Sequence, residues 1–150
     1  MPSIRFIYQS DDQDIEREAV SIKVCEFVST ILDIPDTIEI VFAQMHISVY
    51  GNTVVNPRFK NRININNVLT SNEIPQVLVH ELIHLNQIKT GKLGITSNGR
   101  YIWNGRQITV DPNINHDTLP WEKDVLAKQT AILIKTVEHL STHNNDTLST

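Results

Sequence analysis

The sequence predicts a single α+β domain, and three features of the chain lead to this prediction. Several short stretches alternate apolar and polar side chains, as strands with one buried face do. Two longer stretches repeat apolar residues every three or four positions, as amphipathic helices do. The dipeptide Asn104-Gly105 is a strong hairpin signal. The 150 residues suit one domain, which we expect to span residues 1–140 and to be followed by a polar tail over 141–150.

The first half of the chain is expected to form one helix and a small mixed sheet. Pro35 ends the helix because its ring cannot continue the helical hydrogen-bond pattern. The stretch RININ at 62–66 alternates apolar and polar side chains, and its polar positions suit a strand at the edge of the sheet. The expected elements are a strand over 3–8, a helix over 13–32, and strands over 38–44, 47–55 (with a turn at Gly51-Asn52) and 62–66.

The second half of the chain is expected to form two helices with a hairpin between them. The residues Thr70-Ser71-Asn72-Glu73 have the composition of a helix start, and Gly91 has that of a helix end. The expected elements are a helix over 70–90, hairpin strands over 100–103 and 106–111, and a last helix from about Pro120 to about Leu140.

The composition excludes several classes of protein. The 13 Lys and Arg against 17 Asp and Glu give a net charge of −4, without the basic surplus by which nucleic-acid binders neutralise phosphate. A single cysteine, Cys25, excludes an internal disulfide and a cysteine-rich zinc module. We see neither a secretory signal pattern nor a stretch close to the ~20 apolar residues of a membrane span. We therefore expect a cytoplasmic protein without a nucleic-acid or membrane partner.

The pentapeptide His80-Glu81-Leu82-Ile83-His84 lies in the middle of the helix expected over 70–90. Histidines at positions i and i+4 lie on one helix face, so both imidazoles can bind one ion. Zinc accepts neutral imidazole nitrogens at ~2.0–2.1 Å. Glu81 lies about 100° further round the helix axis. It can therefore reach a zinc-activated water rather than the metal, as a general base must.

The residues around this pentapeptide favour a functional metal site over a chance match. The helix has two apolar faces and only a narrow polar strip between them. A helix of this kind is mostly buried, and buried histidine and glutamate side chains need partners. A histidine with a structural role in the core could explain one imidazole but not the whole pentapeptide. The first apolar face holds Leu78, Leu82 and Leu85, the second holds Val79 and Ile83, and the polar strip holds His80, His84 and Gln87 beside Glu81.

A third metal ligand must come from further along the chain, and a helical wheel favours Glu122. On this wheel Asp124 shares a solvated face with Lys128 and Lys135. Glu122 instead shares its face with an apolar stripe, and a carboxylate that points inward needs a cation. The stripe consists of Leu126, Leu133, Val137 and Leu140. The candidates are Asp111, His116, Asp117, Glu122 and Asp124.

Two alternatives to Glu122 as a ligand stay open at this point. Glu122 could simply be an acidic residue in the first helical turn, where it interacts favourably with the helix dipole. His116 is the main rival ligand, since a histidine in a loop could reach the metal.

The chain resembles a group of small zinc metallopeptidase-like proteins that are common in phage and bacterial genomes. These proteins combine HExxH, a hairpin with a tryptophan, and a Pro-Trp-Glu-x-Glu-Ala segment. They belong with the minimal gluzincin-type zincins, in which two histidines and a later glutamate hold zinc. Asp124 and Val125 stand where the pattern has Glu and Ala, so a role of Asp124 around the ligands is an open question. The segments that carry the resemblance are HELIHLNQ (80–87), Tyr101-Ile102-Trp103-Asn104-Gly105 and Pro120-Trp121-Glu122-Lys123-Asp124.

This resemblance covers roughly residues 70–130 and implies a fold and a site. The implied zincin-like fold packs an N-terminal helix and a small mixed sheet on the HExxH helix, which a hairpin and a C-terminal helix follow. The implied cofactor is Zn²⁺. The implied ligands are His80, His84 and Glu122, and the implied catalytic residue is Glu81.

The expected function is zinc-dependent hydrolysis of peptide bonds in a peptide or protein substrate. Glu81 would take a proton from the zinc-activated water and pass it to the leaving amine. An extended substrate could add to an exposed sheet edge, for which the strand over 62–66 is expected. A donor to the oxyanion could be Tyr50, Tyr101, His46 or His116.

Two other functions are compatible with the motif. A zincin fold could hold zinc as a binding or regulatory module without significant turnover, and the small size of the chain favours this alternative. The presence of Glu81 argues against it, because metal binding alone does not need that glutamate. A protease that acts at DNA would need a basic patch, whereas Arg58, Lys60 and Arg62 are three charges on one loop.

Overall fold

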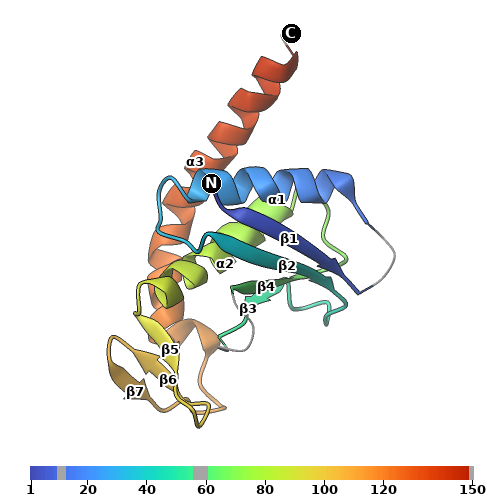
Figure 1. Ribbon diagram of the computed structural model, residues 1–150. Coiled ribbons are helices and arrows are strands. Elements are labelled where there is room, and N and C mark those ends of the chain that lie inside the picture. The colour runs from blue at the N-terminus through green and yellow to red at the C-terminus, as the bar shows by residue number, and fades with distance from the viewer. Residues whose placement is uncertain (10–12, 56–60, 149–150) are drawn as a thin grey trace.

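The structure is a computed structural model that describes residues 1–9, 13–55 and 61–148, of which residues 143–148 are described as backbone only. The described residues form three α-helices and two small sheets, which confirms the predicted α+β class (Figure 1). In chain order the elements are β1 (Ser3–Tyr8), α1 (Ile15–Val28), β2 (Thr37–Ala43), β3 (Gly51–Thr53), β4 (Arg62–Asn66), α2 (Ile74–Lys89), β5 (Leu93–Ile95), β6 (Tyr101–Trp103), β7 (Arg106–Ile108), the 3₁₀ turn η1 (His116–Thr118) and α3 (Pro120–Leu148).

The first sheet has the strand order β1-β2-β4-β3, in which β3 alone is antiparallel to its neighbour. The prediction that residues 62–66 form an edge strand was wrong, because β4 lies between β2 and β3. Its polar side chains contact the neighbouring strands instead of an open edge. Arg62 pairs with Glu39 of β2 at 3.1 Å, and Asn64 donates to Asn52 of β3 at 2.8 Å. Alternation along a strand distinguishes the two faces of a sheet and does not locate its edges.

The apolar face of this sheet packs against the helices. Helix α2 contacts α1 and α3 as well as β3 and β4, so it lies at the centre of the core. The core residues alternate along β2 and β4, which leaves Glu39, Val41 and Asn64 on the opposite face of the sheet. The buried core includes Val24, Cys25 and Val28 of α1, Ile38, Ile40 and Phe42 of β2, Ile63 and Ile65 of β4, Leu78, Val79, Leu82 and Ile83 of α2, and Val125 and Ile132 of α3.

A buried arginine joins α1 to the segment that leads into α2. Asp14 caps α1 by accepting a hydrogen bond from the backbone N–H of Arg17. The Arg17 guanidinium donates to the carbonyl oxygens of Asn67 at 2.8 Å and Leu69 at 3.2 Å. It also lies over the ring of Phe42, 4.5 Å from the centroid. These contacts compensate the buried charge and fix the start of α2 relative to the sheet.

The predicted hairpin is confirmed and belongs to a second, three-stranded sheet of order β5-β6-β7. Asn104 and Gly105 have φ values of 50° and 82°, the left-handed values that a two-residue hairpin turn needs. The sequence did not indicate β5, because three residues are too few to show an alternation. The rings of Tyr101 and Trp121 lie 4.9 Å apart, in a small apolar cluster that attaches this sheet to the start of α3.

Several element boundaries differ from the predicted ones. Helix α1 covers Ile15–Val28 instead of the predicted 13–32. Helix α2 begins at Ile74 instead of near residue 70, because residues 71–73 form a turn. The strand predicted over 47–55 contracts to β3. The Asn66 amide explains this contraction, since it donates to the carbonyl oxygens of His46 at 3.1 Å and Val49 at 2.7 Å. These bonds hold the chain before β3 in a turn.

Helix α3 begins at Pro120 as predicted, but it continues to Leu148 instead of ending near Leu140. Figure 1 shows its C-terminal part extending beyond the rest of the domain. The predicted apolar stripe is partly wrong, because Leu126 and Val137 are 44% and 48% exposed. A helical wheel gives relative angles only, and the burial of Val125 sets the actual orientation. No helix in the described part of the chain is long and apolar enough to cross a membrane.

Gly51→Ala is expected to destabilise the protein, because β3 packs closely on α2. The added Cβ would lie 2.9 Å from Cγ1 of Val77 and 3.0 Å from the backbone oxygen of Asn64. Strand β3 would have to move, which lowers the free energy of unfolding by about 1–3 kcal/mol. Gly94→Ala is the matched control, because the nearest atom to its Cβ is 4.0 Å away. Urea unfolding compares the two variants, and equal midpoints would contradict the close packing.

Candidate metal centre

The HExxH pentapeptide lies on a buried helix, as predicted. Every residue from Glu81 to Gln87 is buried. The rings of His80 and His84 lie edge to face, with their centroids 5.1 Å apart. The side chain of His84 is 8% exposed and that of His80 is 27% exposed. The two imidazoles therefore share one face of α2, and His80 is the more accessible to solvent.

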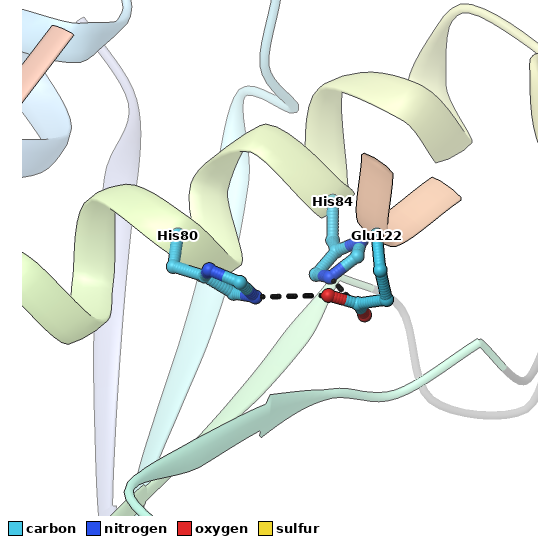
Figure 2. Close-up of side chains that lie close together, drawn as sticks. All are labelled: His80, His84 and Glu122. Carbon is cyan, nitrogen blue, oxygen red and sulfur yellow. Dashed lines mark ion pairs between the residues drawn. The ribbon is translucent and has the colours of Figure 1, made fainter. Parts of the chain in front are cut away.

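The first turn of α3 places Glu122 against both imidazoles (Figure 2). Glu122 Oε2 lies 3.3 Å from Nε2 of His80, and Oε1 lies 2.9 Å from Nε2 of His84. Leu119 and Trp121 help to fix this turn, because both are buried in the apolar cluster with the second sheet. The Glu122 carboxylate is buried and points toward α2, so it is more than a first-turn acid beside the helix dipole.

These three side chains can hold a metal ion. Their ligand atoms lie within 4.8 Å of one another, and no second group of this kind occurs among the described residues. Two ligand atoms that each lie ~2.0–2.1 Å from a tetrahedral zinc ion are about 3.3–3.4 Å from each other. The 3.3 Å between Nε2 of His80 and Oε2 of Glu122 matches that separation, whereas the 2.9 Å between Nε2 of His84 and Oε1 of Glu122 is that of a direct ion pair. Imidazole and carboxylate donors suit a divalent transition metal.

Two glutamines orient the imidazoles. His80 Nδ1 lies 2.8 Å from Oε1 of Gln129, and His84 Nδ1 lies 2.8 Å from Oε1 of Gln87. An amide oxygen only accepts hydrogen bonds, so each Nδ1 carries a proton and each Nε2 is left to bind a metal. The sequence placed Gln87 on the polar strip of α2 without a role. It gave no signal for Gln129, which lies 49 residues from His80 along the chain.

His80, His84 and Glu122 shift one another's pKa values. Burial alone would lower the pKa of His80, but its hydrogen bond to Glu122 and the charge of Glu81 raise this pKa to about 9. The pKa of His84 is also raised, because the same two carboxylates outweigh its burial. Burial opposes the ionisation of Glu122, yet hydrogen bonds from His80 and His84 hold its pKa well below the usual range. The buried Glu122 carboxylate is therefore held in its ionised form, and it raises the pKa values of the two imidazoles that it faces.

A third histidine lies beside the site. His116 belongs to η1, its side chain is 70% exposed, and its Nε2 lies 3.1 Å from Oε1 of Glu122. The group of mutually close ligand atoms contains Glu122 and does not contain His116, which disfavours His116 as the third ligand. The other two loop candidates, Asp111 and Asp117, are exposed.

Asp124 is not the purely solvent-facing residue that the helical wheel predicted. Its predicted pair with Lys128 is present at 3.0 Å, but its Oδ2 also accepts from Nε2 of Gln87 at 2.9 Å. Burial would raise the pKa of Asp124, and the hydrogen bonds from Gln87 and Lys128 lower it below its usual value. The wheel missed this contact because Gln87 reaches Asp124 from α2.

Glu81 is buried beside the ligand group, where α2 meets β3. The hydroxyl oxygen of Thr53 lies 2.9 Å from Oε1 of Glu81 and 3.1 Å from the backbone carbonyl oxygen of Glu81. The Thr53 hydroxyl therefore donates one proton to both of these acceptors. Burial raises the pKa of Glu81, and the charges of His84 and His80 oppose this rise. Nothing in the sequence indicated Thr53, because β3 is short and its register on α2 depends on tertiary contacts.

The other residues considered from the sequence lie in different surroundings. The ring of Tyr101 packs at a tilt against that of Trp121, which precedes Glu122 in the chain. Tyr50 and His46 are exposed in the segment before β3. Of the four possible oxyanion donors, His116 is therefore the one in contact with a ligand residue. Of the three basic residues, Arg62 pairs with Glu39, and Arg58 and Lys60 lie outside the described residues.

No protein-family model, curated protein or solved structure matches this chain. The resemblance to small zinc metallopeptidases therefore stays a prediction. What the site supports by itself is that His80, His84 and Glu122 can hold a metal ion.

Metal binding is expected to release protons near neutral pH. A metal binds neutral imidazole, whereas the pKa of His80 is raised to about 9, so this ring must lose a proton when a metal binds at neutral pH. Titration with Zn²⁺ at pH 7.5 should therefore release about one proton per ion from His80, and less as the pH rises through about 9. Calorimetry in buffers of different ionisation enthalpy measures this number. A binding enthalpy that is independent of the buffer at pH 7.5 would contradict the assignment.

Proposed function

We propose that the protein is a zinc-dependent peptidase with a zincin-like fold, in the gluzincin-type group that its sequence resembles. The observation that carries the proposal is the set of four side chains where α2 meets α3 and β3. His80, His84 and Glu122 offer three ligand atoms, and Glu81 is a buried carboxyl group beside them. Structural zinc sites are closed by four protein ligands, whereas three ligands leave a position for water or substrate.

The arrangement of α2 on the sheet supports a zincin-like fold. The helix that carries HExxH packs on a mixed sheet. The strand at one end of this sheet, β3, is antiparallel to the others and contacts Glu81. The helix that follows the hairpin carries Glu122 in its first turn. This is the order of elements that the resemblance implies.

Glu81 is the proposed general base. Zinc bound at the site supplies Lewis-acid chemistry, which lowers the pKa of water and polarises a carbonyl group. Glu81 Oε2 accepts a proton from the attacking water and donates it to the nitrogen of the leaving amine. Thr53 contacts Oε1, which leaves Oε2 to exchange this proton. The raised pKa of Glu81 suits a group that must both take and release a proton.

The proposed substrate is an extended peptide. We propose that it binds along β3, instead of along the strand over residues 62–66 for which the sequence suggested an edge position. Strand β4 is central, whereas β3 has β4 on one side and no other described strand on the other. A peptide that adds to β3 would gain main-chain hydrogen bonds and would lie next to Glu81. His116, exposed beside Glu122, is the proposed hydrogen-bond donor to the carbonyl oxygen of the substrate.

Purified protein is expected to bind about one zinc ion per chain, as a site with three protein ligands does. Glu122→Ala removes the anionic ligand, so it should weaken zinc binding by roughly 100-fold or more, as should His80→Ala and His84→Ala. His46→Ala is the matched control, because His46 is exposed and its Nδ1 bonds Ser48. Competition with a chromogenic chelator measures the affinities. Equal zinc affinity of Glu122→Ala and His46→Ala would exclude Glu122 as a ligand.

Glu81→Gln is expected to keep zinc and the fold but to lose hydrolysis by at least about 100-fold, because an amide cannot accept the proton from water. The readout is the appearance of new termini, by mass spectrometry, in a synthetic peptide library incubated with zinc-loaded protein. Glu73→Gln is the control, since Glu73 is exposed at the start of α2 and bonds Thr70.

This comparison also separates peptidase activity from the alternative of a zinc-holding module without turnover. That alternative requires normal zinc binding and no cleavage of the library by the parent protein. Equal cleavage by the parent and Glu81→Gln would instead reject Glu81 as the general base.

A further inference from the structure

We infer that Gln87 is a positioning residue that holds His84 in its Nδ1–H tautomer, and that Asp124 acts on His84 through Gln87. The inference deepens the proposed function and rests on it for the effect on zinc affinity. The hydrogen bonds that carry it are present without any metal. They run from His84 through Gln87 to the first turns of α3.

The partners of Gln87 fix which way its amide group points. Its Nε2 lies 2.9 Å from the carbonyl oxygen of Trp121 and 2.9 Å from Oδ2 of Asp124. Both of these oxygens only accept hydrogen bonds, so they require the NH₂ end of the amide. The opposite orientation would place the amide oxygen of Gln87 against two acceptors. The Oε1 end must therefore face His84.

This orientation determines which nitrogen of His84 is available to a metal. Gln87 Oε1 lies 2.8 Å from Nδ1 of His84 and can only accept, so Nδ1 must carry a proton. The lone pair of the neutral ring is then on Nε2, the atom that faces Glu122. A rotated or differently protonated ring would place a proton where the metal binds.

Burial makes this restraint difficult to replace. Gln87 is 0% exposed, so water has no access to take over any of the three hydrogen bonds of its side chain. Gln129, the corresponding partner of His80, is only half-buried. Asp124 adds a charge to the chain of hydrogen bonds, and Lys128 compensates this charge near the surface. We therefore expect His84 to be the more tightly restrained of the two histidine ligands.

The first test observes the tautomer in the parent protein. With ¹⁵N-labelled histidine and bound Zn²⁺, long-range ¹H–¹⁵N spectra should show a protonated Nδ1 and a metal-bound Nε2 for His84, assigned by comparison with His84→Ala. The Nδ1 proton should exchange slowly with water, because Gln87 is buried. Metal bound to Nδ1, or a proton on Nε2 in the zinc form, would overturn the inference.

The second test removes the acceptor with Gln87→Leu. We expect zinc affinity to fall by about 10–100-fold, which is the usual effect of removing a partner of a metal-bound histidine, and the slowly exchanging Nδ1–H signal to disappear. Asp124→Ala should cause a smaller loss of about 3–10-fold, because the Trp121 carbonyl still orients the amide. Lys128→Met is the control and should stay within about twofold of the parent, since its ion pair is partly exposed.

These outcomes separate the inference from the proposed function. If Gln87→Leu keeps both the parent zinc affinity and the Nδ1–H signal, Gln87 has no positioning role. If Gln87→Leu does not fold, the tautomer measured in the parent still decides. If the parent binds no zinc, the proposed function fails. Slow exchange of the Nδ1 proton in the parent, and faster exchange in Gln87→Leu, then still tests the contact between His84 and Gln87.

Discussion

The buried carboxylate of Glu122 is the constraint on which the rest of this structure depends. An ionised carboxylate away from water costs several kcal/mol unless positive charge or hydrogen-bond donors surround it. His80 and His84 supply these donors, and they can do so only if α3 lies along the polar strip of α2. The contact between Glu122 and the two imidazoles therefore adds an electrostatic constraint to the apolar packing of α2 and α3. The sheet and α1 then fix α2 from its other sides.

The centre of the site was predictable because its residues are close together in sequence or lie beside apolar residues that bury them. His80, Glu81 and His84 are on one helix, whose apolar faces already indicated burial. Glu122 follows Trp121, and both are buried in the first turn of α3, although Leu126 and Val137, from which the wheel inferred this burial, are exposed. The hairpin was predictable from Asn104-Gly105, since two consecutive left-handed residues have few other uses.

The parts that could not be predicted depend on contacts between distant elements. Thr53 and Gln129 reach the site because β3 and α3 pack on α2, and no local pattern reports that packing. The position of β4 in the sheet is another case, because the same alternation suits a central and an edge strand. Asp124 is a third, since a wheel drawn for one helix takes no account of a long side chain from its neighbour, here Gln87.

The second sheet lies in the chain between the two helices that supply the ligands, and joining these helices has a thermodynamic consequence. An ion that binds α2 and α3 in the folded chain, and does not bind the unfolded chain, stabilises the packed arrangement of the two helices by mass action. Among the described residues, the small cluster around Leu93, Leu119 and Trp121 attaches the second sheet to α3. An ion at the site requires α2 and α3 to be packed together. The packing of the two helices therefore strengthens binding of the ion by the same free energy by which the ion stabilises the packing, because such coupling is reciprocal.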